Sequence, residues 1–170
     1  MNFSDRFLNW IEFVFRWEGE YYENDPDDAG GETKFGIDKR THPTEDIRNL
    51  TEKRAREIYK IHYWDAVHAD ELPLGVGEIV ADIGVNSGLP RASRWLQRAV
   101  GTTEDGVIGL KTLLAASKAN KHQLELAMLD RRDEFYRSIA KGSHAKFLRG
   151  WLNLNRDLRR LVQNLNHPAS

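Results

Sequence analysis

The chain contains no cysteine, so disulfide bonds, thiol catalysis and cysteine-based zinc sites are excluded, while the cellular compartment stays open. No apolar run approaches the ~20 residues that a membrane-spanning helix requires. The apolar N-terminal stretch is interrupted by charged residues, and we recognise no small-residue cleavage site after it. We therefore expect a soluble protein that is cytoplasmic when synthesised, without stable membrane insertion, and that leaves the cell by release or non-classical export.

A basic excess is also missing. The 25 Lys and Arg residues face 26 Asp and Glu residues, and this net charge of −1 argues against a general nucleic-acid-binding protein. The charge is nevertheless uneven along the chain. Residues 18–32 hold seven carboxylates and no Lys or Arg, whereas residues 130–160 hold nine Lys or Arg against four Asp or Glu. The basic segment is either a solvated helix face or a patch that meets an anionic polymer.

Strand signals are scarce, whereas apolar residues recur at helical spacing along most of the 170 residues. The first helix is expected after Ser4 and should end near Gly19. Residues 20–50 are expected to be mostly loop, with one short extended piece. We predict a mainly α, lysozyme-like helical fold with a long acidic loop after its first helix. The other helices are expected at about 51–64, 76–87, 90–100, 110–117, 121–140 and 145–165.

Glu18 occupies an unusual position in this pattern. It follows Val14 by four residues and Phe7 by eleven, so helical periodicity places it on the apolar stripe at the last turn of the first helix. A carboxyl group on an inward face loses solvation, and this loss raises its pKa. We therefore expect Glu18 to face inward and to hold its proton more tightly than an exposed glutamate.

Metal binding is a poor explanation for the acidic loop. The spacing of Asp25, Asp27 and Gly30 imitates the start of a calcium-binding EF-hand loop, but Ala29 and Gly36 stand where further ligands are required. The six histidines show no zinc-ligand spacing, and neither a serine-hydrolase elbow nor a phosphate-binding glycine loop is present. We expect no metal and no organic cofactor.

Acid–base chemistry by carboxylates fits the loop better. Glycoside hydrolysis needs a protonated acid at the leaving oxygen and a second group that directs water or stabilises the oxocarbenium ion. A buried Glu18 suits the acid role. Glu18, Asp27 and Thr33 also satisfy the pattern E-x8-D-x5-T, which resembles the catalytic signature of phage-type lysozymes.

A longer motif extends this resemblance. Residues 18–21 read EGEY and residues 24–37 read NDPDDAGGETKFGI. Together they resemble the hallmark of the glycoside hydrolase family 108 N-acetylmuramidases. Later segments resemble the predicted peptidoglycan-binding region that follows the catalytic part in that family, so the similarity spans essentially the whole chain. These later segments are Asn86-Ser87-Gly88, Arg91-Ala92, Trp95-Leu96-Gln97, the stretch 105–112 and Phe147 to Trp151.

Two departures from the family pattern affect the assignment of the second carboxylate. Glu20 stands where the family has a second glycine, and one extra residue separates the E-G motif from N-D-P. Counting from Glu18 selects Asp27, whereas counting back from the Gly-Gly pair selects Asp28. Thr33 is selected by either count.

The resemblance implies a peptidoglycan hydrolase that cleaves the β-1,4 bond between N-acetylmuramic acid and N-acetylglucosamine. In that family pattern Glu18 is the acid, and Asp27 or Asp28 handles the water together with Thr33. Tyr22, beside the acid, is a candidate for the substrate cleft, and Gly31 would let the loop backbone approach that cleft. Asn86 is either a helix C-cap or a hydrogen-bond donor to an acetamido group, and Asp82 is taken as a surface acid.

We expect residues 1–75 to form the catalytic region and residues 76–170 to form a helical peptidoglycan-binding region packed against it in one compact unit. The expected partner is the peptidoglycan glycan strand, and the protein is expected to be monomeric. An endolysin of a phage or prophage is the natural setting for such a chain. The alternatives are a non-catalytic peptidoglycan-binding or secretion-accessory protein and a calcium-binding adaptor.

Overall fold

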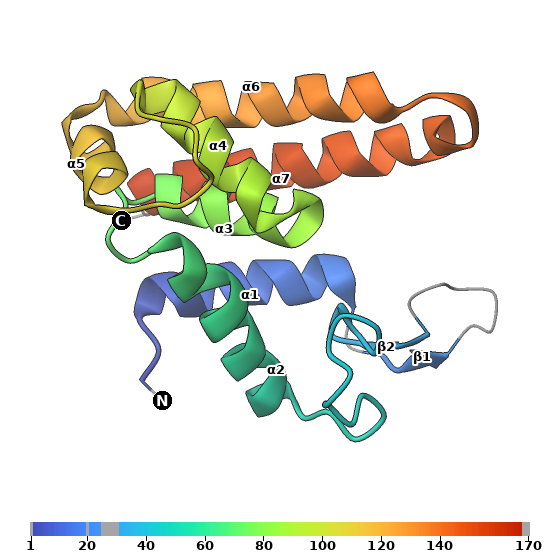
Figure 1. The fold of residues 1–170 in the computed structure, drawn as a ribbon. Helices are drawn as coiled ribbons and strands as arrows, with labels where there is room; N and C mark the ends of the chain where they lie inside the picture. Colours follow the sequence, from blue (N-terminus) through green and yellow to red (C-terminus); the bar gives the residue numbers. More distant parts are fainter. Residues whose placement is uncertain (1, 20, 25–30, 168–170) are drawn as a thin grey trace. The chain divides into compact units, whose positions relative to one another are not determined.

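The computed structural model describes residues 2–19, 21–24 and 31–167. The chain is mainly α-helical, as predicted, and a small sheet lies within the segment that was expected to be mostly loop (Figure 1). The chain divides into two compact units, Met1–His62 and Tyr63–Ser170. The boundary near residue 75 and the packing of both regions into one unit stay predictions.

The first unit is built on its N-terminal helix. The side chain of Ser4 caps this helix by accepting a hydrogen bond from the backbone N–H of Phe7 at 3.2 Å. The helix ends where Gly19 adopts a φ of +83°, which a residue with a side chain rarely adopts. The elements of this unit are α1 (Asp5–Glu18), β1 (Glu23–Asn24), β2 (Glu32–Lys34), β3 (Ile37–Asp38) and α2 (Glu52–Tyr59).

The core of the first unit is aromatic. Phe15 of α1 lies 5.2 Å from Phe35 and 5.9 Å from Tyr59 of α2, measured between ring centroids, and Trp10 lies 6.2 Å from the same tyrosine. All four rings are buried. Large buried rings dominate the apolar area that a core removes from water. This cluster therefore fixes α1, α2 and the turn after β2 against one another.

The second unit is helical throughout its described part, and α3 (Val76–Ser87) is its central helix. Nine successive residues of α3 are buried, and the helix contacts α4, α6 and α7. An apolar helix that is covered on all sides is typical of a core element. In Figure 1, α6 and α7 run side by side along this unit. The helices around α3 are α4 (Leu89–Val100), α5 (Leu110–Lys118), α6 (Lys121–Ile139) and α7 (Leu148–Asn166).

One ion pair is buried inside this helical unit. Asp82 of α3 and Arg132 of α6 approach to 2.6 Å, and their side chains are 2% and 0% exposed. The expectation that Asp82 is a surface acid is therefore wrong. Burial opposes the charged form of both partners and raises the pKa of the Asp82 carboxyl, although Arg132 acts to lower it. Burial also acts to lower the pKa of the Arg132 guanidinium, but the nearby Asp82 and Tyr136 raise it above its ordinary value, so Arg132 stays charged.

Within the residues of known placement, each helix is too short or too polar to cross a bilayer.

Candidate active site

Glu18 is the last residue of α1, and it is exposed. It keeps the helical register of the apolar stripe, because the residues one turn earlier, Val14 and Phe15, are buried. However, the residue as a whole is exposed, although its Cβ and Cγ atoms lie close to the turn at Gly36. The expectation that Glu18 is buried is therefore wrong, whereas the raised pKa expected of its carboxyl group stays a prediction.

A tight turn lies opposite the end of α1. Strands β2 and β3 pair antiparallel with Lys34 opposite Ile37, which leaves only Phe35 and Gly36 in the loop. Both loop residues have positive φ, +53° and +72°, and this combination is the signature of a type I′ hairpin turn. A positive φ is unfavourable for phenylalanine, so the packing of its buried ring must offset the backbone strain.

The Cβ and Cγ atoms of Glu18, which form the stem of its side chain, pack against Gly36. A Cβ atom at Gly36 would lie 2.7 Å from Cγ and 2.8 Å from Cβ of Glu18, and 2.7 Å from the hydroxyl oxygen of Tyr59. These distances are far below van der Waals contact, so any larger residue at position 36 must displace its neighbours. The absence of a side chain here lets the hairpin approach the helix end closely.

Tyr59 holds the turn from the other side. Its hydroxyl donates a buried hydrogen bond of 2.9 Å to the backbone carbonyl of Phe35. Its ring packs against Phe15 of α1. One side chain of α2 thus connects the strained turn to the helix that carries Glu18, and it restricts where the Glu18 side chain can lie.

Thr33 lies in the middle of the same hairpin. It pairs with Glu23 on one side and with Asp38 on the other, and it is half-buried. Its hydroxyl lies 3.5 Å from the carbonyl oxygen of Gly31, a long contact for a hydrogen bond. The structure therefore brings Glu18 and the Thr33 strand to one hairpin. Asp27 and Asp28 lie outside the described residues.

Tyr22 and Gly31 flank this hairpin. The Tyr22 hydroxyl donates to the Glu32 carboxylate at 2.7 Å, and the Arg48 guanidinium lies 5.3 Å from its ring centroid. Because successive residues of a strand face opposite sides, Glu32 and Thr33 are expected on opposite faces of β2. Gly31 has a φ of +72°, and no atom of the described residues lies within 4 Å of the position that a Cβ would occupy there. The substrate contacts assigned to Tyr22 and Gly31 stay predictions.

Asn86 belongs to the second unit, in the last turn of α3, and is exposed. Its side-chain amide donates to the backbone carbonyl of Asp82 at 3.0 Å and lies 3.4 Å from the Asp82 carboxylate. The C-cap of this helix is Gly88 rather than Asn86. Its proposed hydrogen bond to an acetamido group stays a prediction.

No group of three or more His, Asp or Glu side chains is arranged to hold a metal ion in the part of the chain that the structure describes. Asp25 and Asp27, the residues that imitate a calcium loop, lie in the segment whose placement is not described.

The importance of Phe35, Gly36 and Tyr59 was not recognised from the sequence. One signal was available: residues 33–37 read TKFGI, and a glycine between two short extended pieces marks a tight hairpin. No sequence signal indicates that Tyr59 reaches the carbonyl of Phe35, because 24 residues separate the two.

The helical fold, with a glutamate placed beside a hairpin at the end of its first helix, is of the lysozyme-like class of glycoside hydrolases. Comparison with known proteins identifies the family. The model described as "Glycosyl hydrolase 108" matches residues 11–88, and the model described as "Predicted Peptidoglycan domain" matches residues 91–156.

Solved structures include a relative along nearly the whole chain. SagA of Brucella abortus is 30% identical to this chain, with a TM-score of 0.82 over 96% of this chain and 97% of that one. No curated protein matches the chain. The chain therefore belongs to the glycosyl hydrolase 108 family, and at the level of that family it is a peptidoglycan hydrolase.

Proposed function

We propose that this protein is an N-acetylmuramidase that hydrolyses the β-1,4 bond between N-acetylmuramic acid and N-acetylglucosamine in peptidoglycan. The observation that carries the proposal is the position of Glu18, whose stem rests on Gly36 of the hairpin that also contains Thr33. Glycoside hydrolysis requires an acid and a water-directing group at a controlled separation. The hairpin supplies a rigid element that fixes one group relative to the other.

Glu18 acts as the acid that protonates the departing glycosidic oxygen. Its place at the C-terminal end of α1 supports this role, because the partial negative charge of a helix C-terminus disfavours an ionised carboxyl group there. Since Glu18 is exposed in the free protein, the bound glycan must supply the desolvation. A sugar ring that covers the carboxyl group excludes water and favours its protonated form.

Asp27 or Asp28 then activates a water molecule together with Thr33. This arrangement predicts inversion of the anomeric centre if the second carboxyl group lies ~6.5–9.5 Å from Glu18, because that gap accommodates the attacking water. Proton NMR of the first-formed product distinguishes the outcomes. An α-anomer at the new reducing end supports inversion, and a β-anomer contradicts it.

Three residues are proposed to contact the substrate. Tyr22 would stack against or hydrogen-bond a sugar, Gly31 would admit the glycan close to the loop backbone, and Asn86 would bind an acetamido group. The protein is proposed to act as a monomer on the cell wall, after synthesis in the cytoplasm and release from the cell. An endolysin of a phage or prophage is synthesised, released and active on the cell wall in this order.

A second candidate function is supported by the departures from the family motif. Glu20 replaces a glycine beside the acid, and one additional residue precedes N-D-P. Both changes alter the segment that would position the second carboxylate. A non-catalytic peptidoglycan-binding or secretion-accessory protein would retain the fold but would no longer hold the second carboxylate in position for catalysis.

Product analysis separates these functions and also identifies the bond. Purified peptidoglycan is digested with the protein, and the soluble fragments are reduced and analysed by mass spectrometry. A muramidase yields fragments with reduced muramic acid at their ends, whereas a glucosaminidase yields reduced N-acetylglucosamine and would contradict the proposed specificity. Binding to the wall without any release of fragments from several wall types would support the non-catalytic candidate.

A further inference from the structure

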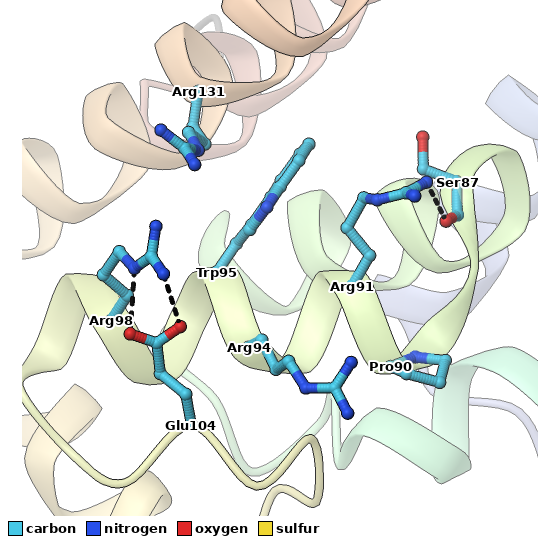
Figure 2. Close-up of a pocket in the computed structure, with 8 residues that line it drawn as sticks. All are labelled: Ser87, Pro90, Arg91, Arg94, Trp95, Arg98, Glu104 and Arg131. Atoms are coloured by element: carbon cyan, nitrogen blue, oxygen red, sulfur yellow. Dashed lines mark hydrogen bonds and ion pairs between the residues drawn. The ribbon is translucent and has the colours of Figure 1, made fainter.

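The second unit contains a pocket lined by arginines (Figure 2). Its volume is about 430 Å³, and it lies between one face of α4, the neighbouring part of α6 and the loop after α4. The side chains that give it its chemistry are Arg91, Arg94, Trp95, Arg98, Glu104 and Arg131.

Three of the arginines are neighbours on one helix. Arg91, Arg94 and Arg98 occupy positions i, i+3 and i+7 of α4 and so lie on one side of the helix. Arg131 of α6 lines the same pocket and lies nearest Arg98 in Figure 2, whereas the guanidinium of Arg94 points away from α6. Like charges at this spacing destabilise a helix. Two of the guanidinium groups lie over aromatic rings, Arg91 at 4.3 Å from the centroid of Phe135 and Arg131 at 6.0 Å from that of Trp95, and these contacts offset part of the repulsion. An anionic ligand would stabilise the four groups further.

Carboxylates of the chain neutralise only part of this charge. Glu104 accepts two hydrogen bonds from Arg98, each 2.9 Å long, and Arg131 lies 3.6 Å from Glu134. Arg91 donates to the backbone carbonyl of Ser87 at 2.8 Å. Among the residues that the structure describes, neither Arg91 nor Arg94 forms an ion pair within 4.0 Å, although Arg91 lies over the Phe135 ring and Arg94 attracts Glu104 and Asp105 over a longer distance. Both guanidinium groups can therefore still pair directly with an anion.

The positive charge of the pocket favours the ionised form of the Glu104 carboxyl group. Its hydrogen bonds to Arg98 lower the pKa of the Glu104 carboxyl, and the charges of Arg98, Arg131 and Arg94 lower it further. A carboxylate brought into this pocket from outside would experience the same attraction. Guanidinium groups bind carboxylates with two parallel hydrogen bonds, which makes them selective as well as attractive.

We propose that this pocket binds the carboxylates of the peptide stems that hang from the glycan strands of peptidoglycan. The half-buried indole ring of Trp95 provides an apolar wall for the stem, and it stands between the arginines of α4 (Figure 2). The pocket lies almost entirely within residues 91–156, the span of the peptidoglycan-domain match. The identity of the ligand rests on the proposed function, because it assumes that the cell wall is the substrate.

Glu104 favours a peptide over a polyphosphate in this pocket. A carboxylate held among the arginines repels a densely anionic chain, whereas a stem peptide carries ammonium as well as carboxylate groups and can satisfy both signs. The net charge of −1 also weakens attraction of the whole chain to nucleic acid.

The test uses the inactive Glu18→Gln protein, so that binding is measured without hydrolysis. In this background a triple variant carries Arg91→Gln, Arg94→Gln and Arg131→Gln, and a matched control carries Arg149→Gln, Arg156→Gln and Arg160→Gln. The control removes the same charge from exposed positions of α7. Arg98 is left in place in both proteins, so that Glu104 keeps its partner.

Two binding measurements follow. Calorimetry measures the affinity for a soluble stem tetrapeptide that contains D-glutamate and a diamino acid, and sedimentation measures binding to purified peptidoglycan. We expect the triple variant to lose about tenfold or more in affinity for the peptide, since each charge-assisted hydrogen bond contributes strongly, and the control to match the parent protein. A single Arg94→Lys variant keeps the charge and should retain part of the affinity, because only the two-point geometry is lost.

Several outcomes would overturn the proposal. Equal peptide affinity of the triple variant and the control would show that the pocket does not bind the stem. Competition by inorganic phosphate or an oligonucleotide, but not by the tetrapeptide, would assign the arginines to phosphate, and competition by peptide-free glycan strands would assign them to sugar. A cooperative melting transition establishes that the triple variant is folded.

Failure of this proposal is distinct from failure of the proposed function. Hydrolysis is measured separately with a protein that retains Glu18, so a muramidase whose pocket does not bind peptide remains a muramidase. Conversely, a protein that binds stem peptide and releases no fragments supports the pocket and contradicts the enzyme.

Discussion

Gly36 shows how one missing side chain defines the proposed active site. Its positive φ completes the turn between β2 and β3, and the space above its Cα accommodates the stem of Glu18. These are two separate requirements at one position. Any residue that tolerates a left-handed backbone could provide the positive φ. Only glycine, which has no side chain, also leaves space for the stem of Glu18.

We expect Gly36→Ala to lower activity far more than stability. The backbone strain should cost about 1–2 kcal/mol. The new methyl group would displace Glu18 or the Tyr59 hydroxyl, and a shift of about 1 Å in a reacting group can reduce the rate roughly 100-fold. The measurements are kcat on solubilised glycan and the melting temperature.

Gly101→Ala is the matched control for that variant. Gly101 has a φ of +73°, nearly the same as Gly36, and nothing lies within 4 Å of the position a Cβ would occupy. Gly101→Ala should therefore lower the stability through backbone strain and leave kcat unchanged. Equal activities of the two alanine variants would contradict the role given to Gly36.

At the scale of elements, the hairpin is held in place by its contacts with two helices. The ring of Phe35 is buried against Phe15 of α1, and its carbonyl accepts the hydrogen bond of Tyr59 from α2. The positive φ of Phe35 is thus maintained by packing on one side and by a hydrogen bond on the other. Loosening either contact should move the hairpin relative to the end of α1.

Tyr59→Phe tests the hydrogen-bonded side of this arrangement. The substitution keeps the ring and removes the hydroxyl, which leaves the buried carbonyl of Phe35 without this donor and should cost about 1–3 kcal/mol in the free energy of unfolding. We also expect a lower kcat with little change in KM, because Tyr59 positions the hairpin without contacting the glycan. A variant that loses stability and keeps its full kcat would show that Tyr59 has only a structural role.

At the scale of the whole molecule, the buried Asp82–Arg132 pair joins α3 to α6 at the centre of the second unit. Replacing one partner of such a pair leaves an uncompensated buried charge. We therefore expect Asp82→Asn to destabilise the protein by about 3–5 kcal/mol, because Arg132 stays charged. Denaturant unfolding measures the change.

Two further variants check this assignment. Asp157→Asn removes a half-buried carboxylate that pairs with the exposed Arg160, and it should change the stability by at most about 1 kcal/mol. Adding Arg132→Met to Asp82→Asn should recover much of the lost stability, because no charge is then buried. A double variant less stable than Asp82→Asn would argue against the unpaired arginine as the cause.

The sequence predicted the helices well, because their apolar residues recur at a regular spacing that survives folding. It misplaced Glu18 because periodicity shows which way a side chain points but not how far it is buried. It misjudged Asp82 because the partner is 50 residues away, although the presence of acids amid the apolar residues of α3 was a usable signal. The arginine face of α4 was visible in the sequence, whereas the approach of Arg131 depended on how α6 packs.

The central claim, that Glu18 is the acid of a muramidase, is tested most directly by one substitution and its control. Glu18→Gln removes the proton donor, and Glu12→Gln makes the same change on the same helix, at an exposed residue that pairs with Arg56. Both proteins and the parent are incubated with purified peptidoglycan, and reduced muramic acid at new chain ends is measured by mass spectrometry. The account predicts abundant product from the parent and Glu12→Gln, and at least ~100-fold less from Glu18→Gln at unchanged melting temperature. Comparable product from Glu18→Gln would contradict it.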